Sequence, residues 1–151
     1  MAAPHCTLLA ELDIQIGDRI AHIGAGTGCY SAILSELVGA SRHVCAVEMD
    51  PNLAAHAQTA LADRANVSVI NADGSQWPLE EMNAIDVNFA VARPAEPWIE
   101  RLRPGGRLVL PLRRKAAVTY PMVLHFVLSA ARVDLQHAGS AQLISSAPVV
   151  D

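Results

Sequence analysis

The chain has 151 residues and a mass of 16.0 kDa, the size of one domain that can bury a core. Hydrophobic residues make up 52% of it and charged residues 17%, a balance that argues against disorder. The net charge of −4 gives no basic footprint for nucleic acid, and no uninterrupted apolar run reaches membrane-spanning length, so we expect neither kind of partner.

The first predicted element is an apolar strand over Ile20–Ile23, followed by a turn that has glycine at positions 24, 26 and 28. Glycine lacks a Cβ, so the backbone there can turn sharply and approach a ligand closely. A helix follows, and its first turn points backbone N–H groups at the space over the glycines. The apolar residues of this helix recur at the 3.6-residue spacing of an α-helix; they are Tyr30, Ile33, Leu34, Leu37 and Val38.

A second apolar strand, 44–47, ends in Glu48, about 20 residues after the last glycine. A carboxylate in this place can accept both hydroxyls of a ribose. Both NAD and S-adenosylmethionine contain that ribose, so Glu48 alone does not choose between them. A dinucleotide-binding G-x-G-x-x-G turn would need glycine at position 29, where this chain has Cys29.

Asp50 and Pro51 predict a capped helix that runs to about residue 63, with Leu53, Ala57 and Leu61 on one face. The short strand 67–70 comes next and leads to Asp73 and Gly74. A carboxylate at a third strand end can bind the amino group of an adenine. The three strand-end features, taken in order, favour S-adenosylmethionine.

A fourth strand is predicted from the alternation of Ile85, Val87, Phe89 and Val91, and it is expected to end near Ala90. Asp86, within this strand, is expected to point to solvent or to a loop.

The sequence then predicts a helix over 93–102, a turn at 104–106 and a strand over 107–112. Segments 121–133 and 142–150 fit an antiparallel strand pair, although the end of the first fits a helix equally well. Strands that alternate with helices indicate a doubly wound α/β sheet, in which ligands bind outside the carboxyl ends of the strands.

Residues 18–112 resemble the core of the class I methyltransferases, and in particular the protein-L-isoaspartate O-methyltransferase type. The resemblance implies a Rossmann-like, mostly parallel sheet with an antiparallel C-terminal strand pair. It also implies one domain over residues 1–151 with a short amino-terminal segment. The matching phrases are His22-Ile23-Gly24-Ala25-Gly26-Thr27-Gly28, Val47-Glu48-Met49-Asp50, Asn71-Ala72-Asp73-Gly74-Ser75 and Leu102-Arg103-Pro104-Gly105-Gly106-Arg107-Leu108-Val109-Leu110-Pro111-Leu112.

The resemblance implies S-adenosyl-L-methionine as cofactor and methyl transfer to a peptide or protein carboxylate, or to a related oxygen of a small molecule. An ionised carboxylate needs no general base, so no catalytic residue is identified. Pro4 and His5 match the family's substrate segment. The cofactor-binding residues that the resemblance implies are His22, Gly24, Ala25, Gly26, Thr27, Gly28, Tyr30, Glu48, Met49, Asp73, Gly74 and Ala90.

Two positions depart from the family's pattern. His22 stands where an acidic residue is usual, and it either contacts the amino-acid end of the cofactor or is a strand histidine satisfied by backbone. Ala2 stands where a serine or threonine is usual, so we expect weak transfer to isoaspartyl peptides, unless the match of this segment is due to chance. A binding module without catalysis is therefore the alternative, and Cys29 disfavours an NAD-dependent enzyme.

The three cysteines, Cys6, Cys29 and Cys45, are odd in number and form no C-x-x-C pair. They predict a reduced setting, and the start of the chain does not resemble a signal peptide, so we expect a cytoplasmic protein. The histidines lack a metal-ligand spacing such as H-E-x-x-H, so no metal site is expected. The sequence leaves the oligomeric state open.

Overall fold

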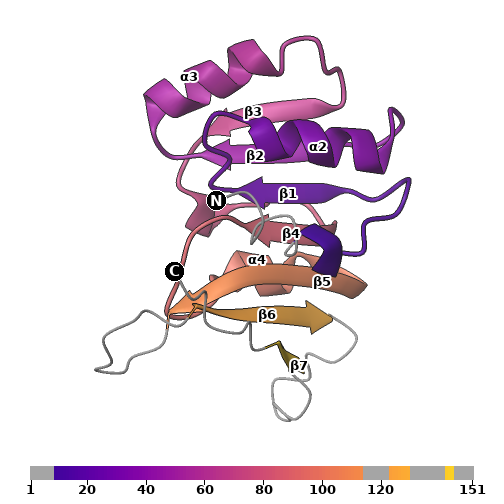
Figure 1. Cartoon of the computed structure of the whole chain (residues 1–151), viewed down its shortest axis with the longest axis vertical. Coiled ribbons are helices and arrows are strands. Elements are labelled where there is room, and N and C mark those ends of the chain that lie inside the picture. Colours follow the sequence, from indigo (N-terminus) through magenta and orange to yellow (C-terminus); the bar gives the residue numbers. More distant parts are fainter. Residues whose placement is uncertain (1–8, 114–122, 130–141, 145–151) are drawn as a thin grey trace, which may run out of the picture.

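The computed structural model describes residues 9–113, 123–129 and 142–144. Strands and helices alternate along most of this length (Figure 1), which confirms the predicted α/β class. In chain order the elements are β1 (Ile20–Ile23), α2 (Cys29–Val38), β2 (Val44–Glu48), α3 (Pro51–Ala60), β3 (Val67–Asn71), the 3-10 helix η1 (Gly74–Gln76), β4 (Met82–Val87), α4 (Glu96–Glu100), β5 (Leu102–Arg113), β6 (Val123–Ser129) and β7 (Gln142–Ile144).

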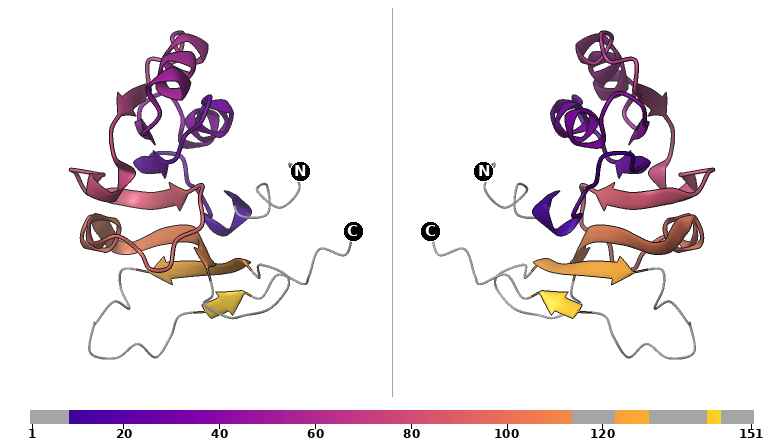
Figure 2. Two further views of the ribbon diagram at one scale, coloured as in Figure 1. Left: turned by 90° about the vertical axis from the view of Figure 1, so that its left-hand side faces the viewer. Right: turned by 90° about the vertical axis from the view of Figure 1, so that its right-hand side faces the viewer.

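The strands form one sheet in the order β3-β2-β1-β4-β5-β6-β7. Each pairing from β3 to β5 is parallel, so the sheet is mostly parallel, as predicted. β6 pairs antiparallel with β5 and with β7. These two strands lie within the segments 121–133 and 142–150, whose other residues are outside the described part of the chain. The sheet is twisted along its length (Figure 2).

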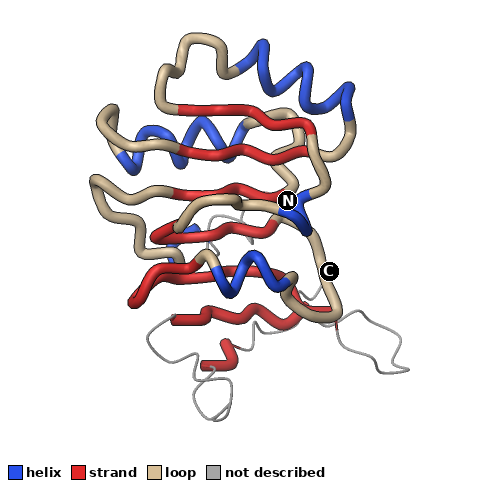
Figure 3. The backbone as a smooth tube through the Cα atoms, turned by 180° about the vertical axis from the view of Figure 1, so that it is seen from behind, coloured by secondary structure: helices blue, strands red, loops and turns tan. Residues whose placement is uncertain are grey.

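Helices cover both faces of the sheet. α2 and α3 lie on one face and α4 on the other (Figures 1 and 3), which is the doubly wound arrangement. Alternate residues of β1 serve the two faces, because Ile20 belongs to the core cluster beneath α2 and Ile23 to the cluster that contains Trp98 of α4. No helix in the described ranges is long and apolar enough to cross a membrane.

The buried face of α2 differs from the predicted one. Ser31, Leu34, Ser35 and Val38 are buried, while Ile33 and Leu37, which belong to the predicted apolar pattern, are 41% and 44% exposed. The serines can be buried because they have partners: Ser31 Oγ lies 2.8 Å from His22 Nδ1, and Ser35 Oγ donates to the Ala32 carbonyl. The pattern of apolar residues alone therefore predicts the wrong buried face for this helix.

α3 begins as predicted, with Asp50 as cap and Pro51 in the first position. The Asp50 carboxylate accepts hydrogen bonds from the backbone N–H groups of Asn52 at 2.8 Å and Leu53 at 3.1 Å. The helix ends at Ala60, short of residue 63. Its buried side chains are Ala54 and Ala57, while Leu53, which was predicted on the same face as Ala57, is 37% exposed.

We expect Asp50→Ala to lower the free energy of unfolding by about 1 kcal/mol, because two helix N–H groups lose their acceptor. Denaturation with urea, followed by circular dichroism, measures this change. Asp63→Ala is the matched control: the residue is exposed and lies beyond the end of α3, so its loss should leave the midpoint unchanged. Equal midpoints for both variants would contradict the capping role.

β4 ends at Val87 rather than near Ala90. Its neighbour β1 ends at Ile23, which pairs with Val87, and the chain of β1 then enters the glycine turn. Asn88 N–H still donates to the Ile23 carbonyl at 2.8 Å, but no further β1 residue remains for pairing. Asp86 is fully buried, so the expectation that it faces solvent was wrong.

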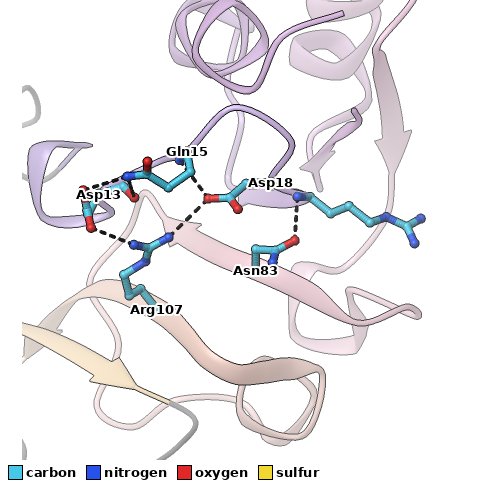
Figure 4. A network of polar contacts seen from close by, with 6 residues as sticks. Asp13, Gln15, Asp18, Asn83 and Arg107 are labelled. Carbon is cyan, nitrogen blue, oxygen red and sulfur yellow. Dashed lines mark hydrogen bonds and ion pairs between the residues drawn. The ribbon is translucent and has the colours of Figure 1, made fainter. Parts of the chain in front are cut away.

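β5 begins before the predicted turn at 104–106, which is an irregularity within the strand. Leu102 pairs with Met82 and Arg107 with Ala84, so the residues between them bulge out opposite a single residue of β4. The Arg107 guanidinium then reaches the loop before β1, where it contacts Asp13 at 3.1 Å and Asp18 at 3.2 Å (Figure 4). Asp18 also accepts from Gln15 N–H at 2.9 Å.

The two described cysteines differ in reactivity. Cys45 lies in the core of β2, and burial, assisted by the Glu80 carboxylate, raises the pKa of its thiol to about 11. The thiolate is the nucleophile, so burial and the raised pKa both keep Cys45 unreactive at pH 8. We expect iodoacetamide at pH 8 to label the exposed Cys29 and to spare Cys45. Peptide mass mapping checks this result, with labelling of both residues in urea as the control.

Candidate cofactor site

The glycine turn crosses the carboxyl ends of β1 and β2. The backbone N–H groups of Gly24 and Ala25 both donate to the Val47 carbonyl, at 2.8 and 3.0 Å. Gly24, Gly26 and Gly28 all have positive φ angles, of 80°, 59° and 91°. A Cβ on Gly26 would meet no described atom within 4 Å. The turn therefore leaves open space over its middle glycine.

The carboxylate of Glu48 is fixed beside this open space. Its Oε2 accepts from Gly26 N–H at 2.8 Å and its Oε1 accepts from Asp50 N–H at 2.9 Å. Glu48 is 9% exposed, and each of its oxygens keeps a second lone pair for a further donor. The side chain thus holds the glycine turn and the start of α3 in one geometry.

The end of β3 lies on the far side of β2. Here Asp73 caps η1: its Oδ1 accepts from Ser75 N–H at 2.9 Å, and hydrogen bonds from the backbone and hydroxyl of Ser75 lower the pKa of Asp73. The next residue, Gly74, accepts a hydrogen bond from Trp98 Nε1 at 2.9 Å. Met49, which follows β2, is 70% exposed. An acidic and an apolar side chain thus flank this part of the edge.

The loop after β4 meets the glycine turn from the other side. Asn88 Nδ2 donates to the Gly24 carbonyl at 3.3 Å. The ring of Phe89 lies against Gly24, since a Cβ built there would come within 2.8 Å of ring carbon Cδ1. Phe89 is 43% exposed and packs edge-to-face with Trp98, with ring centroids 6.1 Å apart. Ala90 follows and is partly buried.

His22 lies beneath the turn, fully buried between the sheet and α2. Its Nδ1 is 2.8 Å from Ser31 Oγ, and its Nε2 is 3.8 Å from Oδ2 of the fully buried Asp86. The two side chains are neighbours because β1 and β4 pair with His22 opposite Asp86. Both ring nitrogens of the histidine therefore lie near polar side chains of neighbouring elements.

Most of the predicted residues come together at this edge. Gly24 to Gly28 form the turn beside Glu48, with open space at Gly26, and Thr27 is exposed there. Tyr30 is partly buried in the first turn of α2. Pro4 and His5, together with Ala2, lie outside the described residues. No group of three or more His, Cys, Asp or Glu side chains within the described ranges could hold a metal ion.

A separate hollow lies at the opposite edge of the sheet. It is bordered by Arg19, Arg42, His43 and Asn66, which stand at or just before the amino ends of β1, β2 and β3. Parallel sheets bind their ligands at the carboxyl ends, and this hollow is widely open to solvent. The carboxyl edge is therefore the better candidate site.

Three residues of this edge were missed or misplaced in the sequence. Phe89 was predicted to be part of a strand, Asp86 was expected to point to solvent or to a loop, and Ser31 was not identified as a site residue. The histidine at position 22 was the available signal, because a fully buried imidazole needs polar partners from its neighbouring elements.

The fold agrees with comparisons to known proteins. The family model described as protein-L-isoaspartate(D-aspartate) O-methyltransferase (PCMT) matches residues 1–125. A protein-L-isoaspartate O-methyltransferase of Methanothrix thermoacetophila is 37% identical over 118 residues, which are 74% of this chain and 56% of that protein. One of Aeropyrum pernix is 39% identical over 110 residues, 70% of this chain and 42% of that protein.

The chain thus spans about half the length of these curated relatives. Among solved structures, one titled protein-L-isoaspartate O-methyltransferase superimposes with a TM-score of 0.77 at 24% identity. That likeness covers 84% of this chain and 40% of the other, and it supports the fold.

Proposed function

Because this chain belongs to the protein-L-isoaspartate(D-aspartate) O-methyltransferase family, we propose that it binds S-adenosylmethionine at the glycine turn and transfers the methyl group to a carboxylate. The observation that carries this proposal is the geometry at Gly26. Its N–H is bound by Glu48, and the space over its Cα is open. A backbone without a Cβ beside a fixed carboxylate suits the ribose of a nucleoside cofactor.

The described residues fit this cofactor along the whole edge. Glu48 has lone pairs left for the two ribose hydroxyls. Asp73 at the end of β3 is suited to the adenine amino group, and the exposed Met49 to the apolar face of the base. Ala25, Thr27, Gly28 and Tyr30, which form the turn and the first turn of α2, line the path of the ligand in this proposal, with Gly74 and Ala90 at its two ends.

His22 acts in this proposal as a positioning residue. It is fully buried, so it reaches the ligand through the first turn of α2, to which Ser31 connects it. Asp86 lies 3.8 Å from the other ring nitrogen, and it brings an acidic side chain to a place beside the position where the family usually has one.

When bound, S-adenosylmethionine supplies a methyl group that its sulfonium makes electrophilic. The protein has to hold an oxygen of the acceptor in line with that methyl group, and proximity supplies most of the rate. A carboxylate acceptor is ionised at neutral pH, so no side chain has to remove a proton. Methyl transfer to a carboxylate therefore does not require a general base, and no catalytic residue was identified in the sequence.

The proposal includes the substrate class and the setting. The acceptor is a peptide or protein carboxylate, with Pro4 and His5 on the substrate side, and the protein works in the cytoplasm. We take residues 1–151 to belong to one methyltransferase-like domain, in which β6 and β7 are the antiparallel strand pair that the resemblance implies.

Two measurements on the full chain test the proposal. Isothermal titration with S-adenosylmethionine, S-adenosylhomocysteine and NAD should give binding of the first two and none of the third. Radiolabelled methyl transfer is then measured to an isoaspartyl peptide and to the same peptide with ordinary aspartate. We expect transfer to the isoaspartyl form, weakened by the alanine at position 2 and increased by Ala2→Ser.

The outcomes separate the alternatives. Binding of NAD alone would replace the proposal with a dinucleotide-dependent activity. Binding of both adenosyl ligands without transfer to either peptide would favour a binding module that does not catalyse. No gain in the Ala2→Ser variant would remove the substrate role from the amino-terminal segment while leaving the cofactor site in place.

A further inference from the structure

The ring of Phe89 is held at one end of the proposed cofactor site. On one side it lies against Gly24, where a Cβ would come within 2.8 Å of its Cδ1. On the other side it meets Trp98 edge-to-face, with an interplanar angle of 69°. Trp98 is itself fixed, being 2% exposed and bonded through Nε1 to the Gly74 carbonyl. Phe89 nevertheless stays 43% exposed, so part of its ring surface faces outward.

The strand order shows which part of the cofactor this ring would meet. Along the carboxyl edge the order β3-β2-β1-β4 places Asp73, Glu48, Gly24 and Phe89 one after another. With adenine at β3 and ribose at β2, the chain that carries the sulfur continues towards β1 and β4. That sulfur bears a full positive charge in S-adenosylmethionine and none in S-adenosylhomocysteine.

We propose that the aromatic ring of Phe89 recognises the sulfonium of S-adenosylmethionine by a cation–aromatic contact and so distinguishes the methyl donor from its neutral product. The face of an aromatic ring carries partial negative charge and attracts a cation within about 6 Å of its centre. A neutral thioether in the same place gains only ordinary packing. This inference rests on the proposed function and deepens it, because it assigns a residue to the discrimination between substrate and product.

A matched set of variants tests this role. Phe89→Leu removes the ring and keeps an apolar side chain, and Phe89→Met fills similar space as a second ring-free variant. Phe89→Tyr keeps the aromatic face. Ile33→Ala is the control, since Ile33 is similarly exposed, at 41%, on the outer side of α2. Each full-length variant is titrated with S-adenosylmethionine, with sinefungin, whose amine is a cation near the same position, and with S-adenosylhomocysteine.

We expect the ring-free variants to lose about 3- to 30-fold in the ratio of donor affinity to product affinity, the range of a cation–aromatic contact. The affinity for sinefungin should fall with that for the donor. Phe89→Tyr and Ile33→Ala should keep the ratio of the unmodified chain. The thermal midpoint of each variant without ligand shows that the fold is retained.

Other outcomes would overturn the inference. An equal loss for donor and product in the ring-free variants would mean that the ring acts by shape alone. Tighter binding of both ligands would mean that it obstructs the site. If the unmodified chain binds neither adenosyl ligand, the proposed function itself fails, and this result differs from the case in which both ligands bind but the ratio does not respond to Phe89.

Discussion

Gly26→Val is expected to abolish cofactor binding, with a loss of affinity of at least about 100-fold, or about 2.7 kcal/mol. A branched Cβ at this residue would project into the open space beside Glu48, where the ribose is proposed to lie. The φ angle of 59° adds strain of about 1 to 2 kcal/mol for a side chain with a Cβ, which lowers the free energy of unfolding. Titration with S-adenosylhomocysteine measures the first effect and thermal unfolding the second.

Gly105→Val is the matched control for this variant. Gly105 also has a positive φ, of 78°, and open space around its Cα, but it lies in the bulge of β5 at the opposite edge of the sheet. It should lose stability in the same way and keep its affinity for the ligand. Normal binding by the Gly26 variant would show that the turn serves the fold alone and would exclude the proposed ligand position.

Glu48→Ala is expected to remove two charge-assisted hydrogen bonds to the ribose and to weaken binding by about 10- to 150-fold, or about 1.5 to 3 kcal/mol, for each well-formed bond, less any compensation by water. The same change should lower the free energy of unfolding, because the N–H groups of Gly26 and Asp50 lose their acceptor. Glu48→Gln should resemble it, since an amide presents an NH₂ group to one of these two donors.

Calorimetric titration of the Glu48 variants gives the affinity, and urea denaturation gives the stability. Glu36→Gln is the control: this glutamate lies on α2, its side chain is 73% exposed, and it pairs with Arg64 at the surface. It should change neither quantity appreciably, as is usual for an exposed ion pair. Full affinity in Glu48→Ala with reduced stability would limit Glu48 to holding the turn.

The sequence predicts the central elements of the fold well. The strand over Ile20–Ile23, the strand that ends in Glu48, and the cap formed by Asp50 and Pro51 all form as expected. Each of them depends on local chemistry: glycines that allow positive φ, a carboxylate at a helix start, and a proline that lacks an N–H. Such features act over a few residues, so the sequence shows them directly.

The end of β4 could not be predicted in this way. The alternation of apolar residues continues to Val91, but a strand needs a neighbour, and β1 provides pairing partners only as far as Ile23. The pairing with β1 stops where β1 turns away, at a residue more than 60 positions earlier in the chain, while on the other side Val91 N–H still donates to the Pro111 carbonyl of β5 at 3.0 Å. The alternation placed Phe89 inside the sheet for this reason, although it belongs to the site edge.

Buried polar groups were the second source of error. Asp86 on β4 was expected to point to solvent or to a loop, and the apolar pattern of α2 did not identify Ser31 and Ser35 as buried residues. Each lies instead beside a polar group from another part of the chain, such as His22 for Ser31 and Arg64 for Ser35. The sequence contains these partners but does not show that they meet, so their pairing follows only from the three-dimensional arrangement.

The ion pairs of Arg107 have a consequence for how the chain folds. They join β5 to residues 94 and 89 positions earlier, at Asp13 and Asp18. A nascent chain that has not yet reached β5 therefore lacks the two ion pairs that join the loop before β1 to this strand. Contacts of such high sequence separation form late and slow the folding of a domain. During synthesis from the amino terminus, the loop before β1 therefore completes its contacts only after β5 has been made. In pulse-labelling by hydrogen exchange, the amides of this loop should become protected last.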